Sequence, residues 1–110
     1  MTSPIPVLSI ATRTGPSGPV IEAVGQLDFD TAPQVRAAVS TTLAAVPTPP
    51  SVDLDLGRLT FCDSAGLTAL IHARNEAARA GSRLRLFAAS ENITALLELT
   101  GAQALFPPAE

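Results

Sequence analysis

An aspartate and a serine, Asp63 and Ser64, stand where the sequence pattern changes from strand to helix. Residues 52–56 alternate apolar and acidic side chains, the pattern of a strand with one buried face. From Leu67 onward the apolar residues recur three and four positions apart, as on one face of a helix. A helix N-terminus has unpaired backbone N–H groups and the positive end of the helix dipole, so it accepts negative charge. Asp63 suits the N-cap, which leaves the Ser64 hydroxyl free to face solvent, where an added phosphate would bring about −1.5 to −2 charges beside the helix N–H groups and Asp63.

Two other roles are open to Ser64. A serine near a helix start is common as a capping residue without further function. A serine hydrolase is the sharpest enzymatic alternative, but its nucleophile elbow needs glycine two positions before the serine, where Cys62 stands. The only histidine, His72, follows eight residues later on the same predicted helix. At about 12 Å by helical rise it is too far away to share a proton, so we expect a surface histidine and a protein that is not an enzyme.

The charged residues suggest two further kinds of site. Five aspartates could gather at one end of a sheet and bind a hard cation: Asp28, Asp30, Asp53, Asp55 and Asp63. However, Asp53 and Asp55 share one strand face and Asp63 serves as a cap, so we favour solvated loop acids together with polar residues on a strand face, and we expect no metal and no cofactor. Three arginines could bind an anion: Arg79, Arg83 and Arg85. Because they flank a helix end, we expect them instead to complement the helix dipole and to keep the surface soluble.

Composition excludes several classes of protein. The 110 residues, 46% of them hydrophobic, suffice for one domain with a real core and are too few for two. A net charge of −3 counts against nucleic acid as the main partner, since phosphate binding needs clustered lysine and arginine. The single cysteine, Cys62, allows no intrachain disulfide, indicates a reducing compartment and is best interpreted as a small, half-buried apolar residue. No apolar run approaches the roughly 18–20 residues that span a bilayer, so we expect a cytoplasmic protein with no membrane partner.

Apolar periodicity and turn residues predict strands and helices in alternation. Strands are expected at residues 7–12, 20–24, 52–56, 84–88 and 104–106. Helices are expected after Asp30 or Thr31, from residue 64 to about residue 80, and from Ser90 to Gly101. The first helix should bury Val35, Val39, Leu43 and Val46, and the second Leu67, Leu70, Ile71, Arg74 and Ala78. Gly57 and Arg58 should end the third strand.

This order predicts an α/β fold in a single domain, residues 1–110. The sheet should be mixed but mostly parallel, because strands joined through helices cross over to parallel neighbours, and it should begin with an antiparallel hairpin. Three main helices complete the fold. Residues 1–5 are expected to form a flexible lead-in and residues 107–110 a short tail.

Three segments resemble the STAS domain family, in the right order along nearly the whole chain. The strand at 52–56, the Leu-x-x-Leu-x-Phe bridge at 56–61 and Asp-Ser-Ala-Gly-Leu at 63–67 resemble the signature of stand-alone anti-sigma factor antagonists. Gly-Gln-Leu-Asp at 25–28, with Thr-Ala after it, resembles the family's turn into its first helix. Leu-Thr-Gly at 99–101 resembles its last turn.

The resemblance implies a non-enzymatic phospho-switch. The family's phosphorylated serine directly follows the aspartate, which corresponds here to Ser64. The unmodified protein would bind an anti-sigma factor that is also a serine kinase, and a metal-dependent serine phosphatase would reset the switch. The implied partner-binding residues are Asp28, Asp63, Ser64, Ala65, Gly66 and Leu67. A monomer or weak dimer is expected.

The chain departs from the family pattern in two places. Ala65 replaces the serine or threonine that many relatives carry, which should concentrate modification on Ser64. The sequence after Pro107 and Pro108 is short, so the family's further C-terminal helix is expected to be absent or vestigial. STAS domains also serve as constitutive structural subunits in lipid-transport or stress-sensing assemblies, and this remains the main alternative function.

Overall fold

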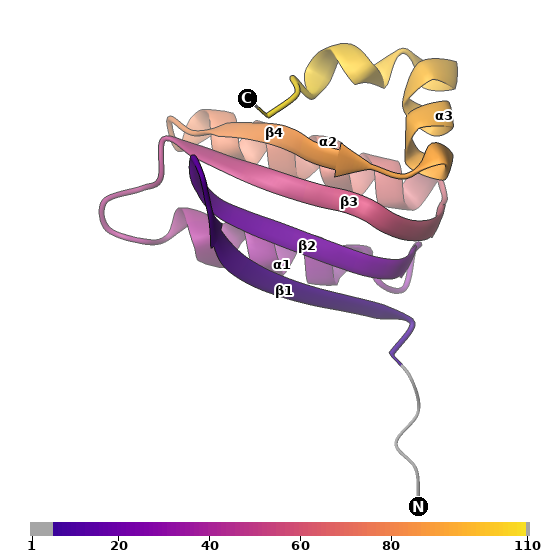
Figure 1. Ribbon diagram of the computed structural model, residues 1–110, viewed down its shortest axis with the longest axis horizontal. Helices are drawn as coiled ribbons and strands as arrows, with labels where there is room; N and C mark the ends of the chain where they lie inside the picture. Colours follow the sequence, from indigo (N-terminus) through magenta and orange to yellow (C-terminus); the bar gives the residue numbers. More distant parts are fainter. Residues whose placement is uncertain (1–5, 110) are drawn as a thin grey trace, which may run out of the picture.

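A four-stranded sheet in the order β1-β2-β3-β4 organises the protein, seen in a computed structural model that describes residues 6–109 (Figure 1). Its strands are β1 (Leu8–Gly15), β2 (Gly18–Leu27), β3 (Ser51–Cys62) and β4 (Arg83–Ala89). β1 pairs with β2 as an antiparallel hairpin, and β2–β3 and β3–β4 are parallel. The predicted α/β fold and mixed sheet are confirmed. The expected lead-in at residues 1–5 lies outside the described residues.

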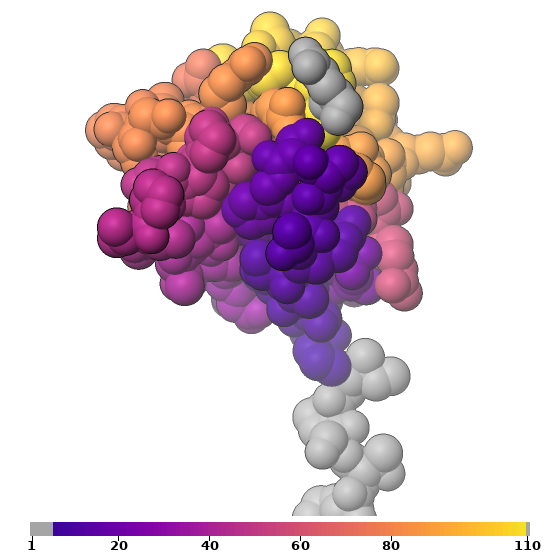
Figure 2. Space-filling model, turned by 60° about the vertical axis from the view of Figure 1, so that its left-hand side comes forward, coloured from indigo at the N-terminus to yellow at the C-terminus, as the bar shows by residue number. Residues whose placement is uncertain are grey.

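Three helices accompany the sheet, as predicted: α1 (Ala32–Leu43), α2 (Ser64–Arg79) and α3 (Glu91–Thr100). Figure 1 shows α1 and α2 together behind the sheet, on one face, with α3 beyond the end of β4. The core fills the layer between the sheet and these helices, and its largest fully buried members are Ile21, Leu27, Leu54, Leu56, Leu59, Leu70 and Ile93. Figure 2 shows one end of the molecule, where the β1–β2 turn comes forward beside the segment that joins α1 to β3. No helix within residues 6–109 is long and apolar enough to cross a membrane.

α2 buries a slightly different face from the one predicted. Arg74 is only half-buried and Ala78 is exposed, whereas Ala69, Ala73 and Ala77 are buried. Alanine carries too little hydrophobicity to distinguish a core position from a surface position in the sequence. The small side chains allow α2 to lie close against the sheet, so the buried face is rotated toward them.

β3 continues through the residues expected to end it. Gly57 and Arg58 lie within the strand, where the Gly57 N–H donates to Asp55 Oδ1 at 3.2 Å. Two register shifts in the β2–β3 pairing keep the strands together as far as the pair Leu27 and Cys62. The strand therefore bends rather than stopping, and it delivers the chain directly to the start of α2.

The end of α1 and the C-terminal segment both depart from prediction. α1 ends at Leu43, and Val46 is 97% exposed instead of buried, because Pro47 disfavours the helical conformation of the residue before it. The strand predicted at 104–106 is a 3-10 helix, η1 (Ala102–Leu105), which begins after Gly101 turns the chain with a φ of 74°. After η1 the chain runs along β4, since Leu86 N–H donates to the Pro107 carbonyl at 2.9 Å.

Candidate functional site

Ser64 is the first residue of α2, and its side chain is exposed. Asp63 is the N-cap, as predicted, and its carboxylate accepts a hydrogen bond from Gly66 N–H at 2.8 Å. Within residues 6–109 the structure records no hydrogen bond to the Ser64 hydroxyl; the bond made at this residue is Thr68 Oγ1 donating to the Ser64 carbonyl at 2.9 Å. The exposed hydroxyl lies beside backbone N–H groups at the start of α2, which favour an added negative charge.

The loop between β2 and α1 lies next to this serine. The backbone N–H of Asp63 donates to the carbonyl of Leu27 at 3.2 Å, which joins the start of α2 to the end of β2. The next residue, Asp28, is half-buried, and its Oδ1 accepts from the N–H groups of Asp30 at 3.0 Å and Thr31 at 3.1 Å. Asp28 thus holds the loop in shape and contributes its remaining surface to the site.

The start of α1 has Thr31, one of the two predicted candidates, at the N-cap position. Thr31 occupies the N-cap, but its side chain makes no capping hydrogen bond within the helix. Its hydroxyl is buried and donates to the Gln26 carbonyl at 2.9 Å, while the Asp28 carboxylate takes the loop N–H groups. Asp30 is exposed. Thr31, one of the two predicted candidates, therefore holds the N-cap position, while Asp28 orders the loop that precedes the helix.

The remaining predicted partner residues fall into two groups. Ala65 is half-buried and reaches the surface beside Ser64, whereas Gly66 and Leu67 are buried. A Cβ on Gly66 would lie 2.7 Å from the Leu27 carbonyl oxygen and 2.9 Å from Cys62 Sγ. Gly66 thus allows α2 to start this close to β2, and Leu67 anchors it in the core. These two residues support the surface from beneath.

Cys62 lies just before the cap and is half-buried, as predicted. Burial raises the pKa of its thiol from 9.0 to about 11, with a smaller contribution from the negative charge of Asp63. The thiol is therefore protonated at neutral pH, and a protonated thiol is a poor nucleophile. This agrees with a packing role.

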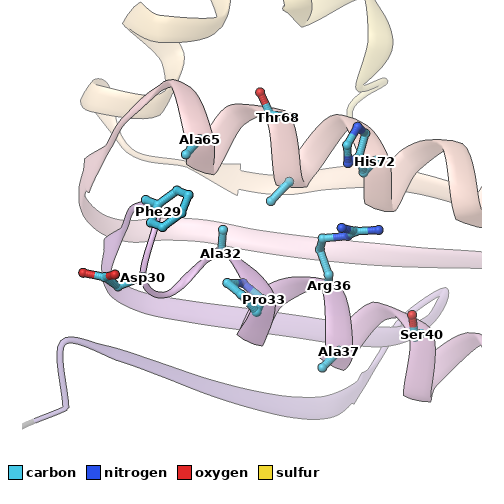
Figure 3. Close-up of a pocket in the computed structure, with 11 residues that line it drawn as sticks. Phe29, Asp30, Ala32, Pro33, Arg36, Ala37, Ser40, Ala65, Thr68 and His72 are labelled. Carbon is cyan, nitrogen blue, oxygen red and sulfur yellow. The ribbon is translucent and has the colours of Figure 1, made fainter.

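Phe29 is a surface residue that our sequence interpretation missed. Phe29 is one of four phenylalanines in the chain, and it is 79% exposed. Figure 3 shows the ring beneath Ala65, at one end of a groove of about 820 Å³ between α1 and α2. The sequence did carry a signal for this exposure, because residues 28–30 place an aromatic residue between two aspartates in a predicted loop. An apolar side chain in a loop has no strand or helix face of its own element to pack against.

The groove continues away from Ser64 between polar walls. Arg36 extends from α1 toward the turn of α2 that carries His72, and both side chains line the groove (Figure 3). His72 is exposed, as predicted. Further along, the Ser40 hydroxyl donates to the Glu76 carboxylate at 2.6 Å and links the two helices. The groove thus has Phe29 and Asp30 at one end and Arg36, His72 and Ser40 among small apolar side chains further along.

The two aspartates of β3 are paired with arginines. Asp53 is 2% exposed, and its two carboxylate oxygens accept from Arg85 Nε at 2.9 Å and Nη2 at 3.3 Å. Arg85 is likewise buried, so it neither complements a helix end nor keeps the surface soluble. Asp55 pairs with Arg13 at 3.1 Å. The residues are brought together because position 53 of β3 lies directly beside position 85 of β4 in the sheet.

Comparison with known proteins places the fold. A family model described as "Mlab, STAS domain" matches residues 10–107. An anti-sigma factor antagonist from Mycobacterium paratuberculosis has a similar structure, with 22% identity and a TM-score of 0.77 over 92% of this chain and 84% of that chain. No curated protein sequence matches the chain.

Two structures of the protein SpoIIAA are also similar. The unphosphorylated anti-sigma factor antagonist SpoIIAA has 21% identity and a TM-score of 0.71, over 93% of this chain and 89% of that chain. The phosphorylated form, a Bacillus cell fate determinant, has 21% identity and a TM-score of 0.67, over 93% of this chain and 92% of that chain. At these identities the likeness shows the fold. Since the family model spans most of the 110 residues, this chain belongs to the STAS domain family.

Proposed function

We propose that the protein is an anti-sigma factor antagonist that is switched by phosphorylation of Ser64. The observation that carries the proposal is the exposed, unbonded Ser64 hydroxyl at the start of a capped helix, beside an exposed apolar surface. The similar structures support it, since they include an antagonist in an unphosphorylated and a phosphorylated form. The partner would be an anti-sigma factor with serine kinase activity, which would release its sigma factor on binding in the cytoplasm.

The docking surface, as we define it, consists of Asp28, Phe29, Asp63, Ser64 and Ala65. Phe29 is its apolar anchor, because burying a phenylalanine side chain contributes about 1.5–3 kcal/mol and this ring is 79% exposed. Aromatic residues of this kind carry much of the binding energy in protein interfaces. The two carboxylates form a polar rim around Ser64.

Phosphorylation would act directly on this surface. In the complex the kinase transfers the γ-phosphoryl group of ATP to Ser64: the serine Oγ–P bond forms, the bond from phosphorus to the ADP oxygen breaks, and the hydroxyl proton passes to a base of the kinase. The helix N-terminus stabilises the added charge of about −1.5 to −2 within the free protein. In the interface the same charge lies beside Asp63 and loses its hydration, at a cost of several kcal/mol. The complex therefore dissociates. It can form again after a metal-dependent phosphatase has hydrolysed the phosphate ester on Ser64.

Binding of charge variants to the cognate anti-sigma factor tests the proposal. Ser64→Asp should raise the Kd at least tenfold in isothermal titration, whereas Ser64→Ala should bind with little change. Thr14→Asp is the matched control, because it adds the same charge at an exposed position in β1, at the opposite end of the sheet, and should not alter the Kd. Equal Kd values for Ser64→Asp and the wild type would refute the switch.

The phosphorylation site and the anchor are tested separately. Incubation with the kinase and ATP, followed by mass spectrometry, should find phosphate on Ser64, and modification that persists in Ser64→Ala would refute the assignment. Phe29→Ala should raise the Kd about tenfold or more without changing the melting temperature, because the ring is outside the core. Unchanged affinity would exclude the loop from the interface.

A second candidate function is a constitutive structural subunit of another assembly. The description of the matching family model favours it, since that description names a STAS domain and no sigma factor regulator. In this case the docking surface binds permanently and Ser64 shapes the contact without being phosphorylated. A pull-down from the native cell discriminates the two: a kinase-like anti-sigma factor supports the switch, and membrane transport or stress-sensing subunits support the constitutive role.

A further inference from the structure

A second hollow, of about 310 Å³, lies at the other end of α2 from Ser64. Its walls come from the last turns of α2, the turn into β4 with the first residues of that strand, the end of η1, and the segment that follows it. Arg74, on one wall, follows Ser64 by ten residues in α2, which corresponds to about 15 Å along the helix. The hollow is therefore separate from the docking surface, and no step of the proposed switch uses it.

Two arginines without a carboxylate partner line this hollow. The salt bridges recorded within residues 6–109 involve Arg13 and Arg85, and neither Arg74 nor Arg83 takes part in one. Arg74 donates one hydrogen bond, from Nη1 to Asn75 Oδ1 at 3.2 Å, which leaves further N–H groups of its guanidinium free. None of the described residues that line the hollow is acidic. Among residues 6–109, no carboxylate thus compensates the positive charge here.

Ser82 supplies a second and independent observation. The residue lines the hollow and is only 5% exposed. Its hydroxyl oxygen is buried and has no hydrogen-bond partner, the one side-chain atom of this kind in the part of the chain that the structure describes. Buried hydroxyls in folded proteins almost always have a partner. The backbone cannot easily move to provide one, because the Ser82 N–H is bonded to the Ala77 carbonyl at 2.8 Å.

The apolar residues of the wall strengthen the hydrogen bonds that these polar groups can make. Ala78, Leu84 and Leu105 contribute apolar surface, which lowers the local dielectric and makes a charge-assisted hydrogen bond stronger than in water. The C-terminal carbonyls of α2 oppose an anion, but they carry only about half an elementary charge in total. Two full positive charges outweigh this.

We propose that this hollow is a binding site for a small oxyanion, a phosphate or carboxylate group, held by the guanidinium groups of Arg74 and Arg83 and by the Ser82 hydroxyl. The planar guanidinium matches the geometry of both kinds of oxyanion. The hydroxyl donates to one ligand oxygen and so obtains the partner it lacks. Such a ligand would join the end of α2, the start of β4 and the C-terminal segment, far from Ser64.

The experiment is a titration of the unphosphorylated full chain with inorganic phosphate at constant ionic strength, followed by NMR of the backbone amides. We expect saturable shifts confined to the lining residues, with a Kd below about 10 mM. Arg74→Gln and Arg83→Gln together should raise that Kd about tenfold or more. Arg79→Gln is the matched control, because it removes the same charge from the exposed end of α2 but does not line the hollow. Acetate and sulfate in parallel distinguish a carboxylate from a tetrahedral oxyanion.

Three results would overturn the proposal. The first is the absence of saturation up to the millimolar range, and the second is an equal loss of binding in Arg79→Gln, which would indicate only the general positive field of the helix end. The third concerns Ser82→Ala, which should raise the Kd severalfold while leaving the melting temperature of the anion-free protein unchanged or higher. A lower melting temperature would mean that the hydroxyl has a protein partner. The anti-sigma factor titration is independent of all three results.

Discussion

The buried ion pair between Asp53 and Arg85 allows a sharp prediction about stability. The arginine donates two hydrogen bonds to the carboxylate, at 2.9 and 3.3 Å, and the side chains of Arg85 and Asp53 are only 10% and 3% exposed. Replacing Arg85 with methionine leaves the carboxylate buried without a counter-charge. Breaking a buried pair in this way costs about 3–5 kcal/mol of unfolding free energy. Against a typical total of about 5–15 kcal/mol, the melting temperature should fall by at least about 10 °C.

Two further variants separate the charge effect from packing. In the double variant Arg85→Met with Asp53→Leu, no charge remains buried, so most of the lost stability should return. Arg13→Met is the control on the same sheet, because Arg13 pairs with Asp55 at 3.1 Å but is 46% exposed, and it should cost no more than about 1 kcal/mol.

The assay is urea denaturation at neutral pH, followed by circular dichroism. A loss below about 1 kcal/mol for Arg85→Met would show that water or another group compensates the carboxylate, and the reasoning about burial would be wrong. A double variant as unstable as the single one would mean that the arginine contributes by packing and not by charge. Either result is read from the denaturation midpoints, provided that the slopes remain equal.

Three other predictions concern the segment around Ser64. Gly66→Ala should lower the unfolding free energy by about 1–3 kcal/mol, because its Cβ would lie 2.7 Å from the Leu27 carbonyl oxygen, and an unchanged denaturation midpoint would contradict this. Asp63→Ala should cost about 1 kcal/mol, since Gly66 N–H loses its capping acceptor; amide hydrogen exchange at the start of α2 should accelerate, and unchanged exchange would argue against the cap. Because burial raises the Cys62 pKa to about 11, the unfolded chain loses the thiol proton first as pH rises, so stability should decline between about pH 9 and 11. Cys62→Ala should remove that decline, and a decline of equal size in the variant would assign it to other groups.

Local chemistry was readable from the sequence because the interacting groups are close along the chain. Asp63 accepts its hydrogen bond from Gly66, and Ser90 accepts one from Ile93 N–H at 3.3 Å, each three residues away. The alternation at 52–56 and the helical spacing after Leu67 likewise reflect neighbours within a few positions. The strand-to-helix junction that exposes Ser64 follows from these signals alone, and so does the order of the four strands and three α-helices up to Gly101.

Burial of charge depended on the register of the sheet. Asp53 and Asp55 have the same residue type and the same face of β3, yet one is 2% exposed and the other is half-buried. The difference arises because Asp53 lies beside Arg85 of β4, 32 positions later in the chain. The neighbouring strand and this arginine shield the Asp53 carboxylate from solvent. No pattern within a single strand carries that information.

The surfaces around the site were also decided by tertiary structure. Phe29 is exposed because the loop before α1 places it across from Ala65, and the hollow near Arg74 exists because the C-terminal segment returns to β4. By itself, the sequence determined which backbone hydrogen bonds form within a turn of helix, and hence where the Ser64 hydroxyl stands. The contacts between side chains far apart in the sequence depended on tertiary packing. Many such contacts compete with one another, and the packing of the whole core decides which of them form.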